Sequence, residues 1–151
     1  MSPEAVALIY GGQSSEHEIS LLSAANVYRA LRHKVIAIYI SRLGSWHYLE
    51  EPSFSEADSR GLSILIRPGE KDPLGTKDGP LKIDVVLPIL HGANGEDGSL
   101  QGLMQILGLP CAGADVAGSA INMDKEIMKR LLSEAGIPTA PFRVYHSLAE
   151  A

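Results

Sequence analysis

The chain contains three short, mainly apolar runs, at Ala5–Tyr10, Val35–Ile40 and Ile83–Leu90. Runs of this length without a regular polar alternation are typical of strands that are buried on both faces of a sheet. Between the first two runs, apolar residues recur in steps of three and four from Leu21 to Leu31, which predicts a helix with one apolar face. Strand, turn, helix and strand in this order form a βαβ unit, so the pattern predicts parallel strands and a right-handed crossover.

The sequence patterns are weaker in two places: at the start of the first helix, and in the segment between the second and third apolar runs. Ser15 and Glu18 have the S-x-x-E spacing of a capping box, which predicts the beginning of that helix. Residues 44–49 and 61–66 favour short strands in a meandering insertion. Residues 67–80 are rich in Pro, Gly, Lys and Asp, and we expect them to form a solvent-exposed loop.

The C-terminal third of the chain changes in pattern. A helix is expected over residues 99–107 and a short strand and turn over residues 110–113. Apolar residues at helical spacing predict another helix over residues 124–135, with Gly136 as its C-cap. Residues 142–145 favour a strand for which the sequence offers no partner.

These patterns divide the chain into an N-terminal α/β domain, residues 1–113, and the incomplete start of a second domain, residues 114–151. The 151 residues are 45% hydrophobic and 21% charged, which suits a soluble globular protein. The net charge of −5 argues against nucleic-acid binding. Cys111 is the only cysteine, and no signal peptide or membrane segment is evident, so we expect a cytoplasmic protein.

The first candidate site is Gly11–Ser20, at the carboxyl end of the first predicted strand, where open α/β sheets bind ligands. Its glycines allow close backbone approach, but the segment is neither a G-x-G-x-x-G fingerprint nor a Walker A loop. Glu16 is either an acid favoured by the helix dipole or a carboxylate that holds a substrate ammonium group. His17 is interpreted as a solvated residue at the helix start, with a role as a base as the alternative.

The second candidate site, His91–Gly98, also follows a predicted buried strand, and its glycines and asparagine permit unusual backbone angles. His91 either closes that strand or lines a ligand site at the same edge as Glu16. Glu96 and Asp97 favour the start of the next helix. The alternating acidic ligands of a calcium-binding loop are missing, so this chemistry is not expected here.

The third candidate site is Ser119–Lys129. Asp124 is placed to cap a helix, and Lys125 and Lys129 lie on one helical face because they are four residues apart. The two lysines form either a solvated basic face or a contact with nucleotide phosphates from an adjoining domain.

Together, the three segments resemble the D-alanine–D-alanine ligases. That family carries a glycine pair followed by S-x-E-H-E-[VI]-S, then H-G-x-x-G-E-D-G-x-x-Q-G, then S-A-x-x-M-D-K. The chain matches these motifs in order at Gly11–Ser20, His91–Gly102 and Ser119–Lys125. The resemblance implies an ATP-grasp enzyme whose N-terminal, pre-ATP-grasp domain is an open, mainly parallel, Rossmann-like α/β sheet with helices on both faces.

The resemblance also implies a reaction, in which ATP phosphorylates one D-alanine and the amine of a second attacks the acyl phosphate to give the dipeptide of peptidoglycan. By position, Glu16 resembles the catalytic carboxylate that binds and orients the ammonium group of the first D-alanine. Ile19, Ser20 and His91 match the surroundings of that substrate, and Lys125 matches a lysine that contacts ATP. Mg²⁺ would bridge the ATP phosphates, although no metal ligand is expected in this chain, and the family implies a homodimer.

The sequence leaves two other functions open. A D-alanine–D-lactate ligase carries nearly the same motifs, and a non-catalytic α/β binding or dimerisation module is compatible with the apolar core of residues 1–113. The ATP loop and the magnesium ligands of the family would lie beyond Ala151. We therefore expect this chain alone to be catalytically inactive.

Overall fold

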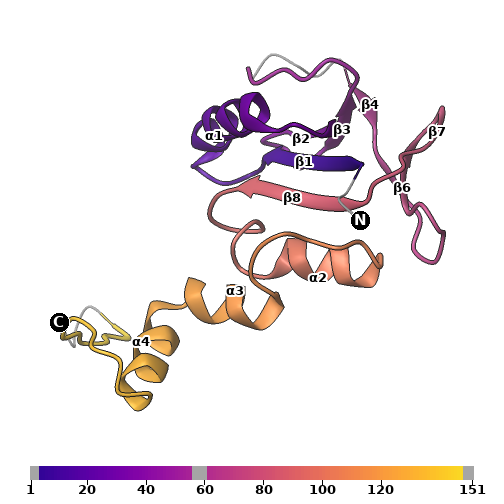
Figure 1. Cartoon of the computed structure of the whole chain (residues 1–151). Helices are drawn as coiled ribbons and strands as arrows, with labels where there is room; N and C mark the ends of the chain where they lie inside the picture. Colours follow the sequence, from indigo (N-terminus) through magenta and orange to yellow (C-terminus); the bar gives the residue numbers. More distant parts are fainter. Residues whose placement is uncertain (1–3, 56–60, 148–151) are drawn as a thin grey trace.

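A five-stranded sheet forms the centre of the computed structural model, which describes residues 4–55 and 61–147. Its strands are β1 (Ala5–Gly11), β2 (Lys34–Ile40), β3 (Trp46–Leu49), β4 (Leu62–Ser63) and β8 (Val85–Leu90). They lie in the order β4-β3-β2-β1-β8 (Figure 1). β1 pairs in parallel with β2 and β8, whereas β3 and β4 add antiparallel pairs at one edge. The expected open, mainly parallel α/β sheet is confirmed.

Helices cover both faces of this sheet. Alternate residues of β1 face opposite sides, and those on each side are apolar and pack in a separate core. α1 (His17–Ala30) lies on one face and α2 (Ser99–Ile106) on the other (Figure 1). Leu8 belongs to the core beneath α1, whereas Ile9 belongs to the core beneath α2, and both are fully buried. The double coverage explains why the sequence of β1 is an unbroken apolar run.

A small antiparallel sheet follows β4 in the chain. It consists of β5 (Leu65–Ile66), β6 (Leu74–Thr76) and β7 (Gly79–Pro80). The prediction of a solvent-exposed loop over residues 67–80 is therefore wrong in part. Leu74 is fully buried in the core on the α2 side, and this long-range packing outweighs the local turn signals.

The other short strands agree better with the sequence patterns. The strand expected over residues 44–49 forms as β3, and the segment 61–66 divides into β4 and β5. Residues 110–113 contribute only a single bridge, in which Cys111 pairs in parallel with Val86 of β8. Beyond β8, this segment therefore adds one bridge to the sheet and not a full strand.

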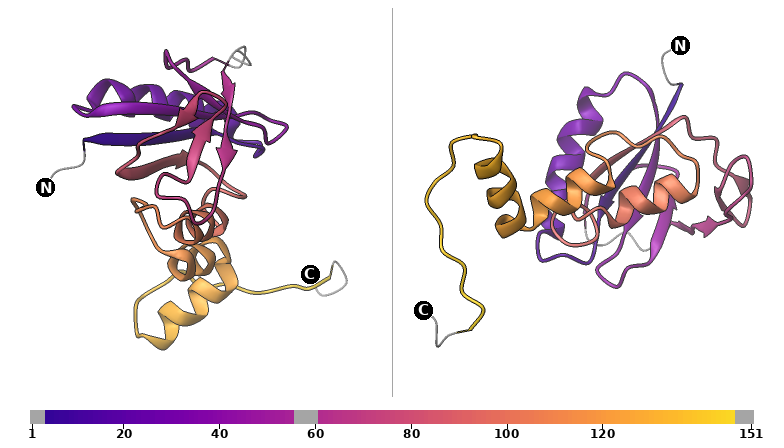
Figure 2. Two further views of the ribbon diagram at one scale, coloured as in Figure 1. Left: turned by 90° about the vertical axis from the view of Figure 1, so that its right-hand side faces the viewer. Right: turned by 90° about the horizontal axis from the view of Figure 1, so that it is seen from below.

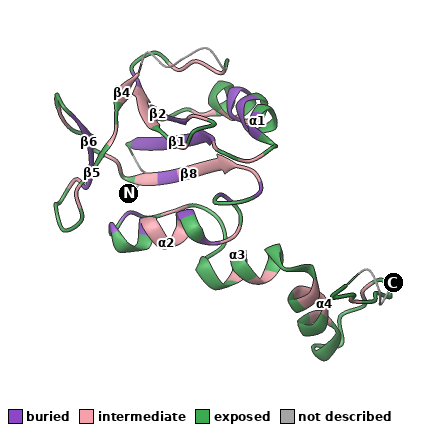
Figure 3. Ribbon diagram, turned by 180° about the vertical axis from the view of Figure 1, so that it is seen from behind, coloured by how far each residue is buried: buried purple, intermediate pink, exposed green. Residues whose placement is uncertain are grey.

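Two helices continue the chain beyond α2. α3 (Val116–Met123) contacts α2, and α4 (Lys125–Glu134) contacts α3, so both lie outside the two layers on the sheet (Figure 2). All residues of α4 are described, and none is buried (Figure 3). α3 was not predicted, and the strand expected over residues 142–145 is absent from these described residues, because no strand lies beside them to share its hydrogen bonds.

The ends of α4 follow the predicted signals. Asp124 is the N-cap, and its Oδ1 accepts hydrogen bonds from the backbone N–H groups of Glu126 and Ile127, both at 3.0 Å. Gly136 follows the helix with a φ angle of +70°, which a glycine adopts without strain. Local sequence therefore determines this helix even where it has little tertiary support.

We expect Met104→Ala to lower the free energy of unfolding by about 2–5 kcal/mol, because Met104 is fully buried and the shorter side chain leaves a cavity. Urea denaturation monitored by circular dichroism measures this loss. Ile106→Ala on the same helix is the control, since Ile106 is 72% exposed and its loss should change stability by no more than about 0.5 kcal/mol. Equal losses in the two variants would contradict the arrangement of α2.

Candidate functional site

The chain turns sharply between β1 and α1 at two glycines. Gly11 and Gly12 have φ angles of +91° and +98°, which residues with side chains rarely adopt. A Cβ atom at Gly11 would lie 2.2 Å from the carbonyl oxygen of Ile40 on β2. The backbone N–H of Gly12 donates to that same oxygen at 2.8 Å. Glycine is therefore required here, and the turn places the start of α1 at the carboxyl edge of the sheet.

Two buried side chains of α1 contact this turn. Ser20 accepts a hydrogen bond from the N–H of Gly11 at 2.8 Å and donates to the carbonyl oxygen of Ile89 on β8. His17 is also fully buried, and its Nδ1 lies 2.6 Å from the carbonyl oxygen of Gly12. The interpretation of His17 as a solvated residue is wrong, because the glycine turn folds back against its ring.

Glu16 is the N-cap residue of α1 and is exposed at the edge of the sheet. The predicted capping box of Ser15 and Glu18 does not form, since among the described residues no side chain caps α1. Ser14 Oγ instead accepts from the N–H of Glu16 at 3.1 Å, and Glu18 pairs with Arg42. Within the described part of the chain, the carboxylate of Glu16 has no hydrogen-bond or ion-pair partner.

The loop after β8, His91–Gly98, is ordered around Asp97. Asp97 accepts from the N–H of Asn94 at 2.8 Å and from the N–H of Ser99 at 3.0 Å. These bonds support the φ angle of +65° at Asn94. Burial acts to raise the pKa of the Asp97 carboxyl, but the hydrogen bonds from Asn94 and Ser99 together outweigh it and hold the pKa below its ordinary value.

His91 is placed between α1 and its own loop. Its Nε2 lies 3.4 Å from Ser23 Oγ, and its Nδ1 lies 3.9 Å from Oε1 of Glu96. The other carboxylate oxygen of Glu96 accepts from the N–H of Gly92 at 2.8 Å. The His91 side chain is 31% exposed and lines two cavities, of about 270 and 520 Å³. The ring is thus oriented by the protein but accessible to a ligand.

The two loops meet at the carboxyl edge of the sheet. A Cβ atom at Gly92 would lie 2.7 Å from Ser14 Oγ and 3.0 Å from Oε2 of Glu16. The expectation that Glu16 and His91 lie near the same edge is therefore confirmed. An exposed carboxylate that has no partner in the described part of the chain and lies against Gly92, the residue after His91, is suited to bind a cationic group such as an ammonium ion.

The other predicted site residues have different surroundings. Ile19 lies one turn after Glu16 and is 51% exposed, whereas the hydroxyl of Ser20 is buried and already used by backbone groups. Lys125 begins α4, and its Nζ donates to a backbone carbonyl of α3 at 2.7 Å. Because α4 lies apart from the sheet (Figure 1), the structure does not bring Lys125 together with the two loops.

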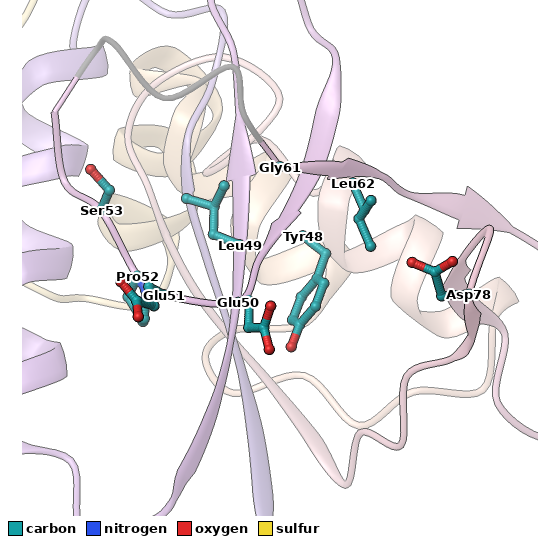
Figure 4. Close-up of a pocket in the computed structure, with 9 residues that line it drawn as sticks. All are labelled: Tyr48, Leu49, Glu50, Glu51, Pro52, Ser53, Gly61, Leu62 and Asp78. Atoms are coloured by element: carbon teal, nitrogen blue, oxygen red, sulfur yellow. The ribbon is translucent and has the colours of Figure 1, made fainter.

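A larger cavity, of about 620 Å³, lies beside β3 and β4 (Figure 4). Its lining includes three acidic residues and none of the residues of the three motifs. The lining residues are Tyr48, Leu49, Glu50, Glu51, Pro52, Ser53, Gly61, Leu62 and Asp78. We therefore do not assign the candidate site to this cavity.

Three polar residues near the loops were given no individual role from the sequence, although Gln13 and Ser14 lie within the candidate segment Gly11–Ser20. Ser14 and Ser23 contact Glu16 and His91 respectively, and Gln13 lines the cavity of about 270 Å³. Helical spacing could have indicated Ser23, because it lies four residues after Ile19 on α1. The contacts of Ser14 and Gln13 depend on the turn, and no periodicity in the sequence reports its conformation.

The described residues limit other kinds of chemistry. Over residues 4–55 and 61–147, no group of three or more His, Cys, Asp or Glu side chains could hold a metal ion. In the same ranges, no helix is long and apolar enough to cross a membrane. Burial raises the pKa of the Cys111 thiol, which disfavours the nucleophilic thiolate.

We expect Ser20→Ala to lower the free energy of unfolding by about 1–3 kcal/mol, because it leaves the buried N–H of Gly11 and the carbonyl of Ile89 without this partner. Urea midpoints compared with those of the unsubstituted chain measure the change. Ser15→Ala, at an exposed position of the same turn, is the control and should have little effect. An unchanged midpoint for Ser20→Ala would show that these bonds add no stability.

The lowered pKa of Asp97 predicts a pH-dependent contribution to stability. A carboxyl with a lowered folded-state pKa stabilises the protein above its unfolded pKa of about 4, and this contribution is lost as the pH falls through the folded-state value. Asp97→Asn should therefore be less stable than the unsubstituted chain at pH 7, and the difference should shrink at about pH 3. Unfolding curves at the two pH values test this, and a constant difference would contradict it.

Comparison with known proteins identifies the family. The family model described as "D-ala D-ala ligase N-terminus" matches residues 5–114. The D-alanine–D-alanine ligase A of Pseudomonas putida is 41% identical over 157 residues, and the match covers 98% of this chain and 45% of that protein. The chain thus spans less than half the length of this relative.

Solved structures agree with this match. The D-alanine–D-alanine ligase from Coxiella burnetii superposes with a TM-score of 0.82 at 36% identity, covering 91% of this chain and 42% of that one. A D-Ala:D-Ser ligase from Enterococcus faecalis has a TM-score of 0.80 at 34% identity, covering 90% of this chain and 43% of that one. The chain therefore belongs to the D-alanine–D-alanine ligase family and corresponds to the N-terminal region of these enzymes.

Proposed function

We propose that this chain forms the substrate-binding N-terminal part of an ATP-dependent D-alanine–D-alanine ligase. The observation that carries the proposal is the carboxylate of Glu16, which is exposed at the glycine turn, lies against Gly92 of the His91–Gly98 loop and has no partner among the described residues. A hydrogen bond between a carboxylate and an ammonium group contributes about 1.5–3 kcal/mol. Glu16 is thus suited to hold the amino end of a small amino acid.

In the proposed reaction, the carboxylate of a first D-alanine is phosphorylated by ATP, and the amine of a second D-alanine displaces phosphate to form the dipeptide used in peptidoglycan. Glu16 binds the ammonium group of the first D-alanine and favours its charged form, which has no lone pair and is not a nucleophile. The first D-alanine therefore reacts through its carboxylate. His91 and the exposed Ile19 would line the same subsite.

ATP would be bound jointly by this chain and by the segments of the ligases that lie outside the region matched by this chain. Lys125 is exposed, and its ammonium group fits a contact with a phosphate of ATP. The described residues do not fit Mg²⁺, because no cluster of three or more candidate ligands lies within them. We propose that the chain alone is inactive, and that the complete enzyme acts as a homodimer in the cytoplasm, where ATP is available.

The identity of the second substrate does not follow from the N-terminal fold. The chain is similar to the Coxiella burnetii D-alanine–D-alanine ligase and to the Enterococcus faecalis D-Ala:D-Ser ligase, at 36% and 34% identity. Since one N-terminal fold serves both enzymes, we propose that the choice of the second substrate is made elsewhere. A D-alanine–D-lactate ligase is therefore the second candidate function, supported by the same motifs.

A chimera tests the proposed function. Joining this chain to the remaining C-terminal part of the Pseudomonas putida ligase supplies the segments that the match does not cover. With ATP, Mg²⁺ and D-alanine, we expect the chimera to form the dipeptide and release phosphate, and we expect the chain alone to do neither. Glu16→Gln in the chimera should lower kcat/KM for the first D-alanine by about 10- to 100-fold, because the charge-assisted bond is lost.

Glu18→Gln is the matched control for this experiment. Glu18 lies in the same turn of α1 and is also exposed, but it pairs with Arg42 instead of facing the His91–Gly98 loop. Its loss should leave kcat/KM nearly unchanged. A folded chimera that forms no dipeptide would contradict the proposed function, and equal effects of the two substitutions would contradict the role of Glu16.

A further inference from the structure

His17 occupies a position that the proposed reaction does not use. It is the first residue of α1, and its side chain is fully buried although its neighbours Glu16 and Glu18 are exposed. Its ring stands edge-on to the ring of Tyr39 on β2, with centroids 5.7 Å apart and an angle of 81° between the planes. A polar ring is thus enclosed directly beside the proposed substrate carboxylate.

The hydrogen bonds of this ring define its tautomer. Nδ1 of His17 lies 2.6 Å from the carbonyl oxygen of Gly12, and a carbonyl oxygen only accepts, so Nδ1 carries a proton and donates. In the neutral ring, Nε2 is then an acceptor, and it faces the hydroxyl of Tyr39 at 3.4 Å. The protein, and not the solvent, determines which nitrogen is protonated.

The bond from His17 acts on a turn that has little stiffness of its own. Gly12 has a φ angle of +98°, and a glycine has no side chain to restrict it. Ser20 holds the first residue of the turn by accepting from Gly11. The bond from His17 holds the carbonyl of Gly12, and it links that carbonyl to the residue that directly follows Glu16.

We propose that His17 is a positioning residue, whose Nδ1–H bond to the Gly12 carbonyl holds the start of α1 against the glycine turn and so directs Glu16 towards the His91–Gly98 loop. Glu16 meets that loop closely, since a Cβ atom at Gly92 would lie 3.0 Å from its Oε2. A small rotation of the helix start would therefore move the carboxylate. The role of Glu16 as the substrate carboxylate rests on the proposed function, but the geometry of the turn does not.

Two substitutions distinguish this hydrogen bond from a space-filling role. The amide nitrogen of asparagine occupies the place of Nδ1, so His17→Asn retains a donor towards Gly12. The amide nitrogen of glutamine occupies the place of Nε2, so His17→Gln loses that donor while it fills more of the ring's volume. A positioning role thus predicts that the smaller residue is the better replacement, and a space-filling role predicts the reverse.

Nitrogen-15 NMR of this chain tests the proposal. In the unsubstituted chain, we expect His17 to show a protonated Nδ1 and an unprotonated Nε2. We expect His17→Asn to leave the amide resonances of Gly12, Glu16 and Gly92 close to their original positions, and His17→Gln to shift all three. The methyl resonance of the buried Met104 reports whether each variant retains its core.

A protonated Nε2 with an unprotonated Nδ1 would overturn the proposal, and this result requires no variant to fold. Equal shifts in the two variants, or smaller shifts in His17→Gln, would also overturn it, because the ring would then only fill space. If the NMR results are as expected but the unsubstituted chimera forms no dipeptide, the proposed function fails while the positioning role of His17 stands.

Discussion

The close approach of Gly11 to the carbonyl oxygen of Ile40 is the constraint on which the arrangement of the site depends. A Cβ atom at this position would lie 2.2 Å from that oxygen, so only glycine fits there. It leaves β1 with a left-handed backbone and begins α1 at the carboxyl edge of the sheet. Leu21 and Ala24 of α1 then pack on one face of the sheet, which keeps the helix start in place.

Buried polar groups stabilise this turn, and the proposed binding group is left exposed. Ser20 and His17 are fully buried and bond to backbone atoms of the turn and of β8. A buried polar group without a partner costs about 1–3 kcal/mol, so these bonds favour one conformation of the turn. Glu16 is next to His17 but exposed. A carboxylate on a backbone held in this way is preorganised for a ligand, which lowers the entropy lost on binding.

The residues proposed to bind substrate and those proposed to bind ATP lie in parts of the chain that differ in how well they are packed. The two loops are anchored at the edge of a sheet whose β1 strand is fully buried, whereas Lys125 lies on α4, in which no residue is buried. Two apolar residues of α4, Ile127 and Leu131, are 47% and 49% exposed. The Pseudomonas putida and Coxiella burnetii ligases are more than twice as long as this chain, in line with the proposal that the nucleotide side needs further segments.

The sequence by itself determined the strands of the parallel core, the helices α1, α2 and α4, the family and the two loops of the candidate site. These features depend on local signals: apolar runs, helical spacing, the cap at Asp124 and motifs of fixed spacing. Only the tertiary structure decided that Leu74 is buried, that His17 is enclosed beneath the turn, that no strand forms over residues 142–145 and that Lys125 lies apart from the loops. Each of these depends on which distant atoms pack against the segment, and such contacts leave no periodic trace along the chain.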